Sequence, residues 1–498
     1  MRMRKLLALS ALAPVLLLAA CGGGSSSSPP PAVTIFVSPL QASVPTNGQQ
    51  PFRATVSGTS NTAVNWSVSG SGCTGSACGT IRVSGLYTAP ASVPSPPGVT
   101  VTAVSQADTT KSATATETII SPTSGNLNRM QQTPPIELGT SGGNANDISG
   151  SFCCSGTLGA LVSRSGIDFI LSNNHDLARR DQAMPGEPIT QPGLVDTNCH
   201  PAQVVANFTQ AAPLGAPGNK PSGVDAAIAQ IVSGMVDMTG AILELGPVVS
   251  GVPQPAPPAS TPVTATIGES VAKSGRTTGL TCANIQSTNT TASVQYQPNC
   301  NSGTPFSVNF NNQIVVNGST FSAAGDSGAL IIDSNTAQPV ALLFAGNTTS
   351  TLGNPIQTVL NALPDPNTGA IPAIVGGAQR MVAACPGGFP GAPVPGSGAF
   401  SAVRPRPSDT DVQRATTVKE AHVEELMSDP AVFGVGVGAA DDNPAEPVVV
   451  IYVEPGKPHR PIPPQLNGVR TKVISTDRFR AYGWNENEHG VQQACSVR

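Results

Sequence analysis

Short runs typical of β-strands, each ended by turn-forming residues, constrain this chain more than any other feature of its sequence. Four of them lie near the N-terminus, at residues 33–37, 52–56, 64–68 and 99–103. The 498 residues include 52 glycines and 48 prolines, and only 11% are charged, a composition that suits strands and turns and disfavours helical bundles. We therefore expect a mainly β chain, long enough for about three domains.

The first twenty residues have the pattern of a signal peptide. A basic start precedes an apolar run over 6–18, which is shorter than the roughly 20 residues of a membrane span. The following Leu18-Ala19-Ala20-Cys21 resembles a bacterial lipobox, which implies cleavage before Cys21 and lipidation of its thiol. Because Gly22 rather than Asp comes next, we expect the cell envelope, with the outer membrane or surface favoured over the inner membrane. An ordinary secretory signal is the alternative.

Composition then divides the N-terminal part of the chain. Residues 21–31 contain only glycine, serine and proline after Cys21 and read as a flexible tether. Residues 32–121 hold the four runs above and are expected to form a small β-sandwich. Trp66 and the stretch 85–90 resemble bacterial immunoglobulin-like surface modules. This resemblance implies a spacer or, as the alternative, a weak binding unit.

The remainder divides into three segments. Residues 126–363 form the longest unit, with strand after strand and glycine-rich turns, whereas 364–408 are rich in proline, glycine and alanine and read as a linker. A helix is predicted over 410–427, followed by strands at 432–437 and 448–453. We therefore predict that 409–498 form a small α/β domain that folds alone.

Ten cysteines in an exported chain permit disulfides. Cys73 and Cys78 are close enough to close a small loop, and we predict that Cys282 pairs with Cys300 across a hairpin. Sequence alone does not pair the remaining ones, which are Cys153, Cys154, Cys199, Cys385 and Cys495. The cysteines are scattered and no Cys-x-x-Cys motif occurs, so we expect no metal site.

Three short segments carry the residue types of nucleophilic catalysis. An apolar run leads into His175, Asp225 opens a second apolar run, and Ser327 lies in Gly325-Asp326-Ser327-Gly328 before a third. A serine hydroxyl becomes a good nucleophile when a neutral imidazole takes its proton, and a carboxylate can hold that imidazole in the required tautomer. Each segment alone also has a structural reading, but the three together favour a catalytic triad. His200 follows no strand and is expected in a loop.

The Gly-Asp-Ser-Gly loop and the chain order His, Asp, Ser resemble trypsin-like serine peptidases of a bacterial branch. The resemblance covers about residues 140–363 and implies a double Greek-key β-barrel without a metal or organic cofactor. It also implies an oxyanion hole formed by the N–H groups of Gly325 and Ser327.

Two further stretches extend the resemblance. Residues 273–281 are similar to the start of the second barrel in bacterial and plant members. Residues 341–346 resemble the strand that pairs with the substrate backbone. By this resemblance the specificity pocket takes its wall and base from Phe344, Ala345, Gly346 and Phe321.

The chain departs from the family pattern at four points. Asn173-Asn174 stands where the family usually has small residues before the His. Phe321 occupies a position that is often Asp, which argues against Arg/Lys specificity. Asp176 directly follows His175, where the family often has Cys. The activation site of the digestive enzymes, a basic residue before Ile-Val-Gly-Gly, is missing, so activation by a new N-terminus is not expected.

We therefore predict a lipid-anchored serine endopeptidase that acts on a protein or peptide through an acyl-enzyme. The alternatives are a catalytically inert surface binding or adhesion protein on a peptidase fold, and an esterase with the same triad. The formal net charge is −4 and no basic stripe is visible, so no nucleic-acid partner is expected.

Overall fold

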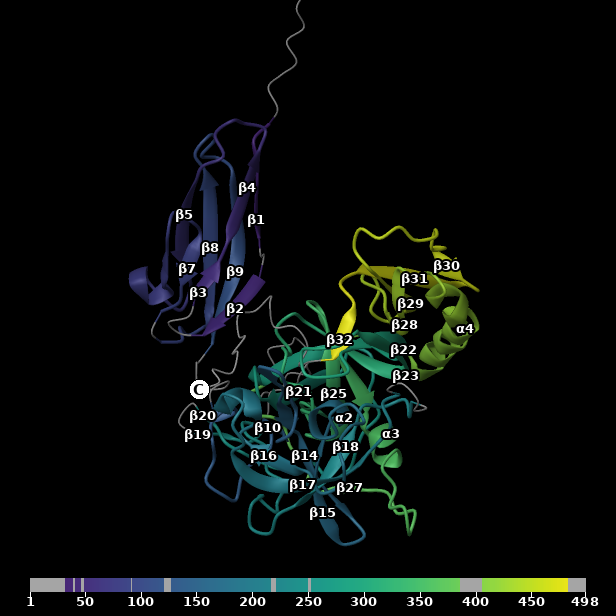
Figure 1. Ribbon diagram of the computed structural model, residues 1–498. Helices are drawn as coiled ribbons and strands as arrows, with labels where there is room; N and C mark the ends of the chain where they lie inside the picture. The colour runs from purple at the N-terminus through teal and green to yellow at the C-terminus, as the bar shows by residue number, and fades with distance from the viewer. Residues whose placement is uncertain are drawn as a thin grey trace, which may run out of the picture. The chain divides into compact units, whose positions relative to one another are not determined.

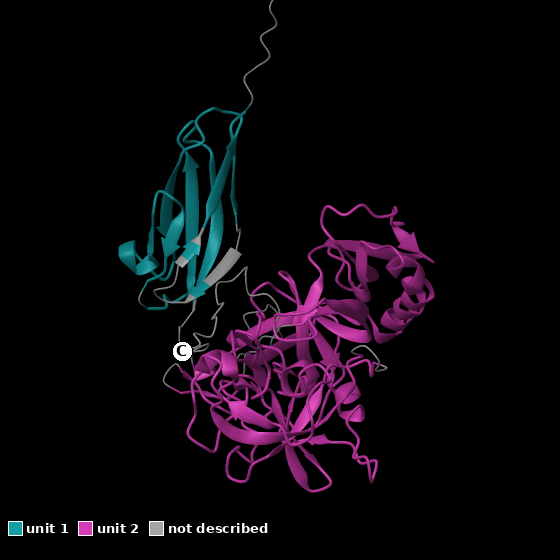
Figure 2. Cartoon of the chain, viewed as in Figure 1, with its two compact units in different colours: residues 1–120 teal, residues 121–498 magenta. Residues whose placement is uncertain are grey.

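The computed structural model describes residues 32–38, 41–45, 49–90, 92–120, 127–215, 221–249, 252–385 and 405–481. The chain forms two compact units, 1–120 and 121–498 (Figure 2). The architecture is mainly β (Figure 1). The predicted signal peptide and tether, with Cys21, and also Cys495 lie outside the described residues.

Three small sheets enclose one core in the N-terminal unit. The first sheet pairs β1 (Thr34–Ser38) with β4 (Arg53–Ser57). The second has the strand order β2 (Gln41–Pro45), β9 (Ser112–Ile120), β8 (Gly98–Ser105), β5 (Val64–Ser69). The third has the strand order β3 (Gln49–Pro51), β7 (Leu86–Thr88), β6 (Thr80–Ile81). Every second side chain of β8 is buried, because Val99, Val101 and Ala103 face the core. The immunoglobulin-like character of this unit stays a prediction.

An eight-stranded sheet opens the second unit. Its neighbouring strands pair antiparallel, in the order β13 (Gly156–Leu158), β10 (Thr140–Asn144), β16 (Pro188–Gln191), β17 (Gln203–Ala211), β18 (Ala227–Ile231), β15 (Ile167–Ser172), β14 (Ala160–Arg164), β27 (Ala373–Ile374). Short elements connect or flank it: β11 (Ile148–Ser149), β12 (Phe152–Cys153), α2 (Asn174–Leu177), η2 (Leu194–Thr197), β19 (Val248–Val249) and β20 (Val252–Pro253). One large apolar cluster packs residues of this sheet together with residues of the following strands and α3 (Ile356–Asn361).

A six-stranded ring follows. The order is β21 (Ser270–Gly275), β24 (Leu330–Asp333), β25 (Pro339–Gly346), β26 (Ser350–Pro355), β23 (Phe306–Asn317), β22 (Gly279–Tyr296). The ring closes because β21 pairs with β22 as well as with β24. Helix α3 (Ile356–Asn361) comes directly after β26. Closure removes the free sheet edges that an open sheet of this size would leave.

The C-terminal segment continues the sheet of this ring. It comprises α4 (Asp409–Met427), β28 (Val432–Ala439), β29 (Pro447–Val453), β30 (Gln465–Leu466), β31 (Val469–Ser475) and β32 (Phe479–Ala481). The Ser408 hydroxyl accepts from the N–H of Asp411 at 3.1 Å and caps α4. β28 pairs antiparallel with β22, so one sheet runs from the ring into the C-terminal segment. Residues 409–481 are therefore not a compact unit of their own in this structure.

The predicted linker also packs on the body of the second unit over its described part. β27 adds a strand next to β14, Val382 is buried, and Cys385 forms a disulfide. Composition predicts a linker because proline and glycine dominate 364–408, but the described residues 364–385 pack against the second unit through β27, Val382 and Cys385. Residues 386–404 lie outside the described ranges.

Four disulfides are present among the described residues. Cys73 bonds to Cys78 and closes the small loop that their spacing suggested. The predicted bond between Cys282 and Cys300 is wrong: Cys282 bonds to Cys385, and Cys300 bonds to Cys154. β22 runs unbroken from Gly279 to Tyr296, so Cys282 lies near the start of one long strand and Cys300 lies past its end, rather than the two facing each other across a hairpin. The fourth bond joins Cys153 to Cys199.

Candidate active site

Strand pairing brings His175 and Asp225 together. β15 pairs with β18 so that Leu171 faces Ile228 and Ser172 faces Ala227. The chain leaving β15 therefore meets the chain entering β18. The Nδ1 atom of His175 lies 2.6 Å from Oδ2 of Asp225, and the His175 backbone N–H donates to Oδ1 at 3.2 Å. This contact fixes the ring and leaves Nε2 as the atom that can exchange a proton with a substrate or nucleophile.

Three polar groups for which the sequence predicted no role hold Asp225. The Tyr296 hydroxyl donates to Asp225 Oδ2 at 2.9 Å. The Asp225 N–H donates to Asn354 Oδ1 at 2.9 Å, and Asn173 Nδ2 donates to the Asp225 carbonyl at 2.6 Å. Burial, together with the Asp225 charge, raises the pKa of Tyr296 well above its ordinary value, so this hydroxyl stays a neutral donor. The fully buried Asp225 carboxylate is thus stabilised by hydrogen bonds.

Glycines shape the loop that carries Ser327. Gly325 and Gly328 have φ values of +94° and +88°, in the left-handed region that favours glycine. A Cβ at Gly328 would lie 2.2 Å from the Thr157 carbonyl oxygen, so a side chain there is also excluded by contact. The Thr157 N–H donates to the Ser327 carbonyl at 2.7 Å, and its hydroxyl donates to the Gly325 carbonyl at 2.9 Å. The eight-stranded sheet therefore holds the loop that extends from the ring.

Asp326 fixes the same loop from the other side. Its carboxylate accepts from the N–H of Thr277 at 2.7 Å and from the Thr278 hydroxyl at 2.7 Å. Lys273, which is fully buried, places Nζ 3.4 Å from Asp326 Oδ2. Burial lowers the pKa of Lys273, and the Asp326 charge acts against that shift. The stretch 273–281 thus anchors the loop from within the ring, and this internal anchoring needs no new N-terminus.

A carboxylate stands between the expected nucleophile and its expected base. Asp176 Oδ1 lies 3.5 Å from Nε2 of His175, and the Ser327 hydroxyl donates to the same oxygen at 3.3 Å. Nε2 of His175 has no hydrogen-bond partner among the described residues. A direct Ser327–His175 hydrogen bond, which proton transfer requires, is therefore not formed in this conformation.

The charges at this position favour a protonated imidazole. Burial by itself lowers the pKa of His175, but the carboxylates of Asp176 and Asp225 outweigh it, and the net shift is upward. Burial raises the pKa of Asp176, which the charge of His175 opposes. A protonated His175 cannot take a proton from Ser327. This conformation therefore does not favour proton transfer from Ser327 to His175.

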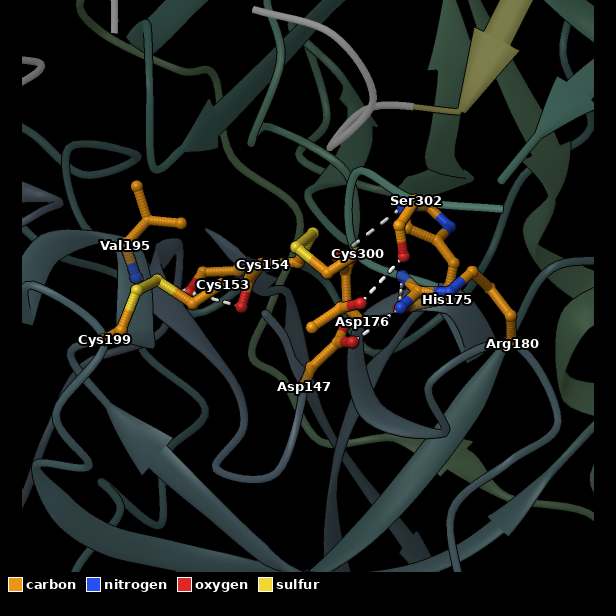
Figure 3. Close-up of a disulfide and its surroundings, with 12 residues drawn as sticks. Asp147, Cys153, Cys154, His175, Asp176, Arg180, Val195, Cys199, Cys300 and Ser302 are labelled. Carbon is orange, nitrogen blue, oxygen red and sulfur yellow. Dashed lines mark hydrogen bonds and ion pairs between the residues drawn. A yellow bond between two sulfur atoms is a disulfide. The ribbon is translucent and has the colours of Figure 1, made fainter. Parts of the chain in front are cut away.

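A disulfide and an ion pair border this group. Arg180 donates to Asp147 Oδ1 at 2.5 Å and to the His175 carbonyl at 3.3 Å. The Cys154–Cys300 bond joins the segment between β12 and β13 to the segment after β22, close to His175 and Asp176 (Figure 3). A small pocket here is lined by Cys154, Ser155, His175, Asp176, Arg180, Tyr296, Gln297, Asn299, Asn301 and Ala481.

The four residues predicted for the specificity pocket are buried in this conformation, and their role stays a prediction. Phe321 and Phe344 are both buried, Phe321 in the core of the ring and Phe344 against Phe310 at 4.9 Å between ring centroids. Neither phenylalanine side chain is accessible to a substrate in this conformation. The backbone of Ala345 and Gly346 pairs with β32.

Three further observations bear on the predicted roles. His200 is exposed in the loop after η2, as expected, and is not among the residues that line the site. No group of three or more His, Cys, Asp or Glu side chains within the described ranges could hold a metal ion. No described helix has both the length and the apolar character that crossing a bilayer requires.

Comparisons with known proteins add little. No family model and no curated protein matches the chain. Among solved structures it is similar to one described as "A glutamic acid specific serine protease utilizes a novel histidine triad in substrate binding". The TM-score is 0.32 and the identity 15%, over 47% of this chain and 99% of that one. Glutamate specificity and the histidine triad are properties of that protein. The chemistry of the present site depends on its own geometry.

Proposed function

We propose that this protein is a serine endopeptidase that hydrolyses peptide bonds through an acyl-enzyme. The observation that carries the proposal is the 2.6 Å contact between His175 and Asp225 beside Ser327, with Ser327 on a loop between two β-barrel-like sheets. The loop has the glycines that an oxyanion site requires, and its neighbours hold it from both sides.

In the proposed reaction Ser327 Oγ attacks the substrate carbonyl carbon while Nε2 of His175 takes the hydroxyl proton. The N–H groups of Gly325 and Ser327 stabilise the negative charge that develops on the carbonyl oxygen. His175 then passes its proton to the leaving amine, and the acyl group stays on Ser327. Water, deprotonated by His175, attacks the ester, and Ser327 regains its proton. Asp225 keeps the ring in the required tautomer throughout.

This sequence requires Asp176 to leave the space between Ser327 and His175. Its other carboxylate oxygen, Oδ2, has no hydrogen-bond partner among the described residues, so the side chain is held on one side only. Substrate binding or displacement of a neighbouring segment would supply the free energy for that movement.

Digestion of a peptide library by the purified mature protein tests this proposal. We expect cleavage products that are absent with the Ser327→Ala variant. If wild type and variant give the same products, the cleavage has another source and the proposal fails. A protein that hydrolyses nitrophenyl esters but cuts no peptide would instead support the esterase alternative.

One observation favours the inert alternative, a surface binding protein on a peptidase fold. The Ser327–His175 contact is absent, and Asp176 occupies its place. A protein that reacts with no serine-directed probe under any condition would support this alternative. The buried His175–Asp225 pair argues against it, because a site that only binds has no need of an oriented imidazole.

We further propose that the protein is secreted and anchored by lipid at Cys21, with the N-terminal unit as an immunoglobulin-like spacer. The support is the Leu-Ala-Ala-Cys sequence after a short apolar run. Four disulfides fit an oxidising compartment outside the cytosol.

A further inference from the structure

The last described strand of the chain lies between two strands of the ring. β32 pairs parallel with β22, where Phe479 faces Val294 and Arg480 faces Gln295. It also pairs antiparallel with β25 (Figure 1). A three-residue strand with partners on both sides is enclosed by main-chain hydrogen bonds rather than laid on a surface.

The contact with β25 falls on the residues expected to bind a substrate backbone. Ala481 faces Ala345 and Arg480 faces Gly346, in the antiparallel direction. An extended peptide added to this edge would form main-chain hydrogen bonds with the same backbone groups. Each N–H donates and each C=O accepts in a defined direction, so β32 and a substrate strand compete for this edge.

Side-chain contacts anchor the segment just before this contact. The Phe479 ring is fully buried, with its centroid 5.3 Å from that of Phe433 and 5.5 Å from that of Tyr452. Just before it, the Asp477 carbonyl accepts from Asn347 Nδ2 at 2.7 Å, at the turn that follows β25. The segment is therefore bound by an aromatic cluster as well as by its backbone.

The end of β32 reaches the catalytic pocket. Ala481 lines the same small pocket as His175 and Asp176. Ser327 has no exposed surface, and His175 is 4% exposed. Ser327 is thus inaccessible, Asp176 lies between Ser327 and His175, and β32 pairs with the strand edge expected to bind the substrate.

We propose that residues 476–481 are a built-in occupant of the substrate-binding edge, which keeps the site closed until the segment is displaced or removed. This inference rests on the proposed peptidase function. Because the segment is tethered, its effective concentration at the edge is in the millimolar range or higher, so a free substrate of modest affinity competes poorly. The partner that the edge accepts is an extended peptide.

A chain that ends after Ser475 tests the inference. We expect a fluorophosphonate probe to label Ser327 at least tenfold faster in this truncated protein than in the full mature chain. The synthetic peptide Ile-Ser-Thr-Asp-Arg-Phe-Arg-Ala, which copies residues 474–481, should slow the labelling again, and a scrambled peptide should not. Circular dichroism shows whether the truncated protein is folded.

A point variant covers the case in which truncation prevents folding. Phe479→Ala removes the anchoring ring but keeps the chain, and it should also speed labelling. Phe52→Ala is the matched control, because Phe52 is an equally buried ring in the other compact unit. It should leave the rate unchanged.

The outcomes separate this inference from the proposed function. Equal labelling rates in the full chain, the truncated chain and Phe479→Ala would overturn the inference and leave the peptidase proposal intact. If no form labels, the peptidase proposal fails. In that case, a fluorescently labelled copy of the 474–481 peptide is tested for binding to the chain that ends after Ser475 and carries Ser327→Ala. Binding would still support the inference that β25 accepts this segment, and absence of binding would overturn that inference as well.

Discussion

The Ser327 hydroxyl and Nε2 of His175 are joined through one oxygen of Asp176, at 3.3 Å and 3.5 Å, and not through a direct hydrogen bond. Asp176, which directly follows His175 in the sequence, thus lies where a proton would pass from Ser327 to His175. Asp176 is 5% exposed, so its carboxylate is shielded from bulk solvent. The three residues of the proposed triad therefore lack, in this conformation, the direct contact that proton transfer from Ser327 to His175 needs.

Asp176→Asn should speed fluorophosphonate labelling and shift its pH dependence. A carboxylate beside the ring favours the imidazolium and raises the pKa of His175, so its removal lowers that pKa. Only the neutral ring accepts a proton, and the rising limb of labelling against pH should therefore move to lower pH. An unchanged midpoint would show that Asp176 does not act on His175. Asp168→Asn, which changes a carboxylate outside the site, is the control.

Tyr296→Phe should reduce the labelling rate about tenfold while leaving the protein folded. The lost hydroxyl donates to the buried Asp225 carboxylate, and a hydrogen bond to a charged group contributes about 1.5–3 kcal/mol. In the Asp225→Asn background, Tyr296→Phe should reduce the labelling rate little further, because both substitutions disrupt the same Tyr296–Asp225–His175 hydrogen-bond chain. Additive losses in the double variant would mean that Tyr296 acts elsewhere.

Peptide mapping without reduction should recover Cys154 linked to Cys300 and Cys282 linked to Cys385. The first bond spans 146 residues, for which chain entropy predicts a stabilisation of about 5 kcal/mol. The Cys154→Ser, Cys300→Ser double variant should therefore unfold at much lower urea concentration. Recovery of a peptide that links Cys282 to Cys300 would contradict the structure.

Cys21→Ser should release the protein from the membrane fraction of the producing cell, because stable anchoring needs covalently attached acyl chains. Fractionation followed by immunoblotting measures the distribution. If wild type and variant fractionate alike, the lipid anchor is not at this residue.

Local patterns in the sequence were enough to single out the candidate triad. His175 and Ser327 each lie beside an apolar strand, and the Gly-Asp-Ser-Gly loop has a short-range signature. The structure brings His175 and Asp225 together because β15 and β18 pair in a defined register. The mainly β architecture and the helix at α4 follow from equally local signals, namely period-two runs, acidic residues near the start of the helix and Asp429-Pro430 at its end.

The missed features all depend on contacts between distant residues. The disulfide partners are set by closure of the ring and by the path of β22, neither of which spacing reveals. Tyr296 reaches Asp225 across 71 residues, and β32 reaches β25 from beyond the C-terminal sheet. Asp176 was visible as a departure next to His175, but only its side-chain position shows that it separates His175 from Ser327.

Mass-spectrometric mapping of a fluorophosphonate adduct tests the central claim most directly. The probe is offered to the full mature chain, to the chain ending after Ser475 and to Phe479→Ala. We expect one adduct, on Ser327, that is lost in Ser327→Ala and His175→Ala and reduced by about four orders of magnitude in Asp225→Asn. His200→Ala should label like its parent. If no form labels, or if the adduct maps to a serine other than Ser327, the peptidase account is contradicted.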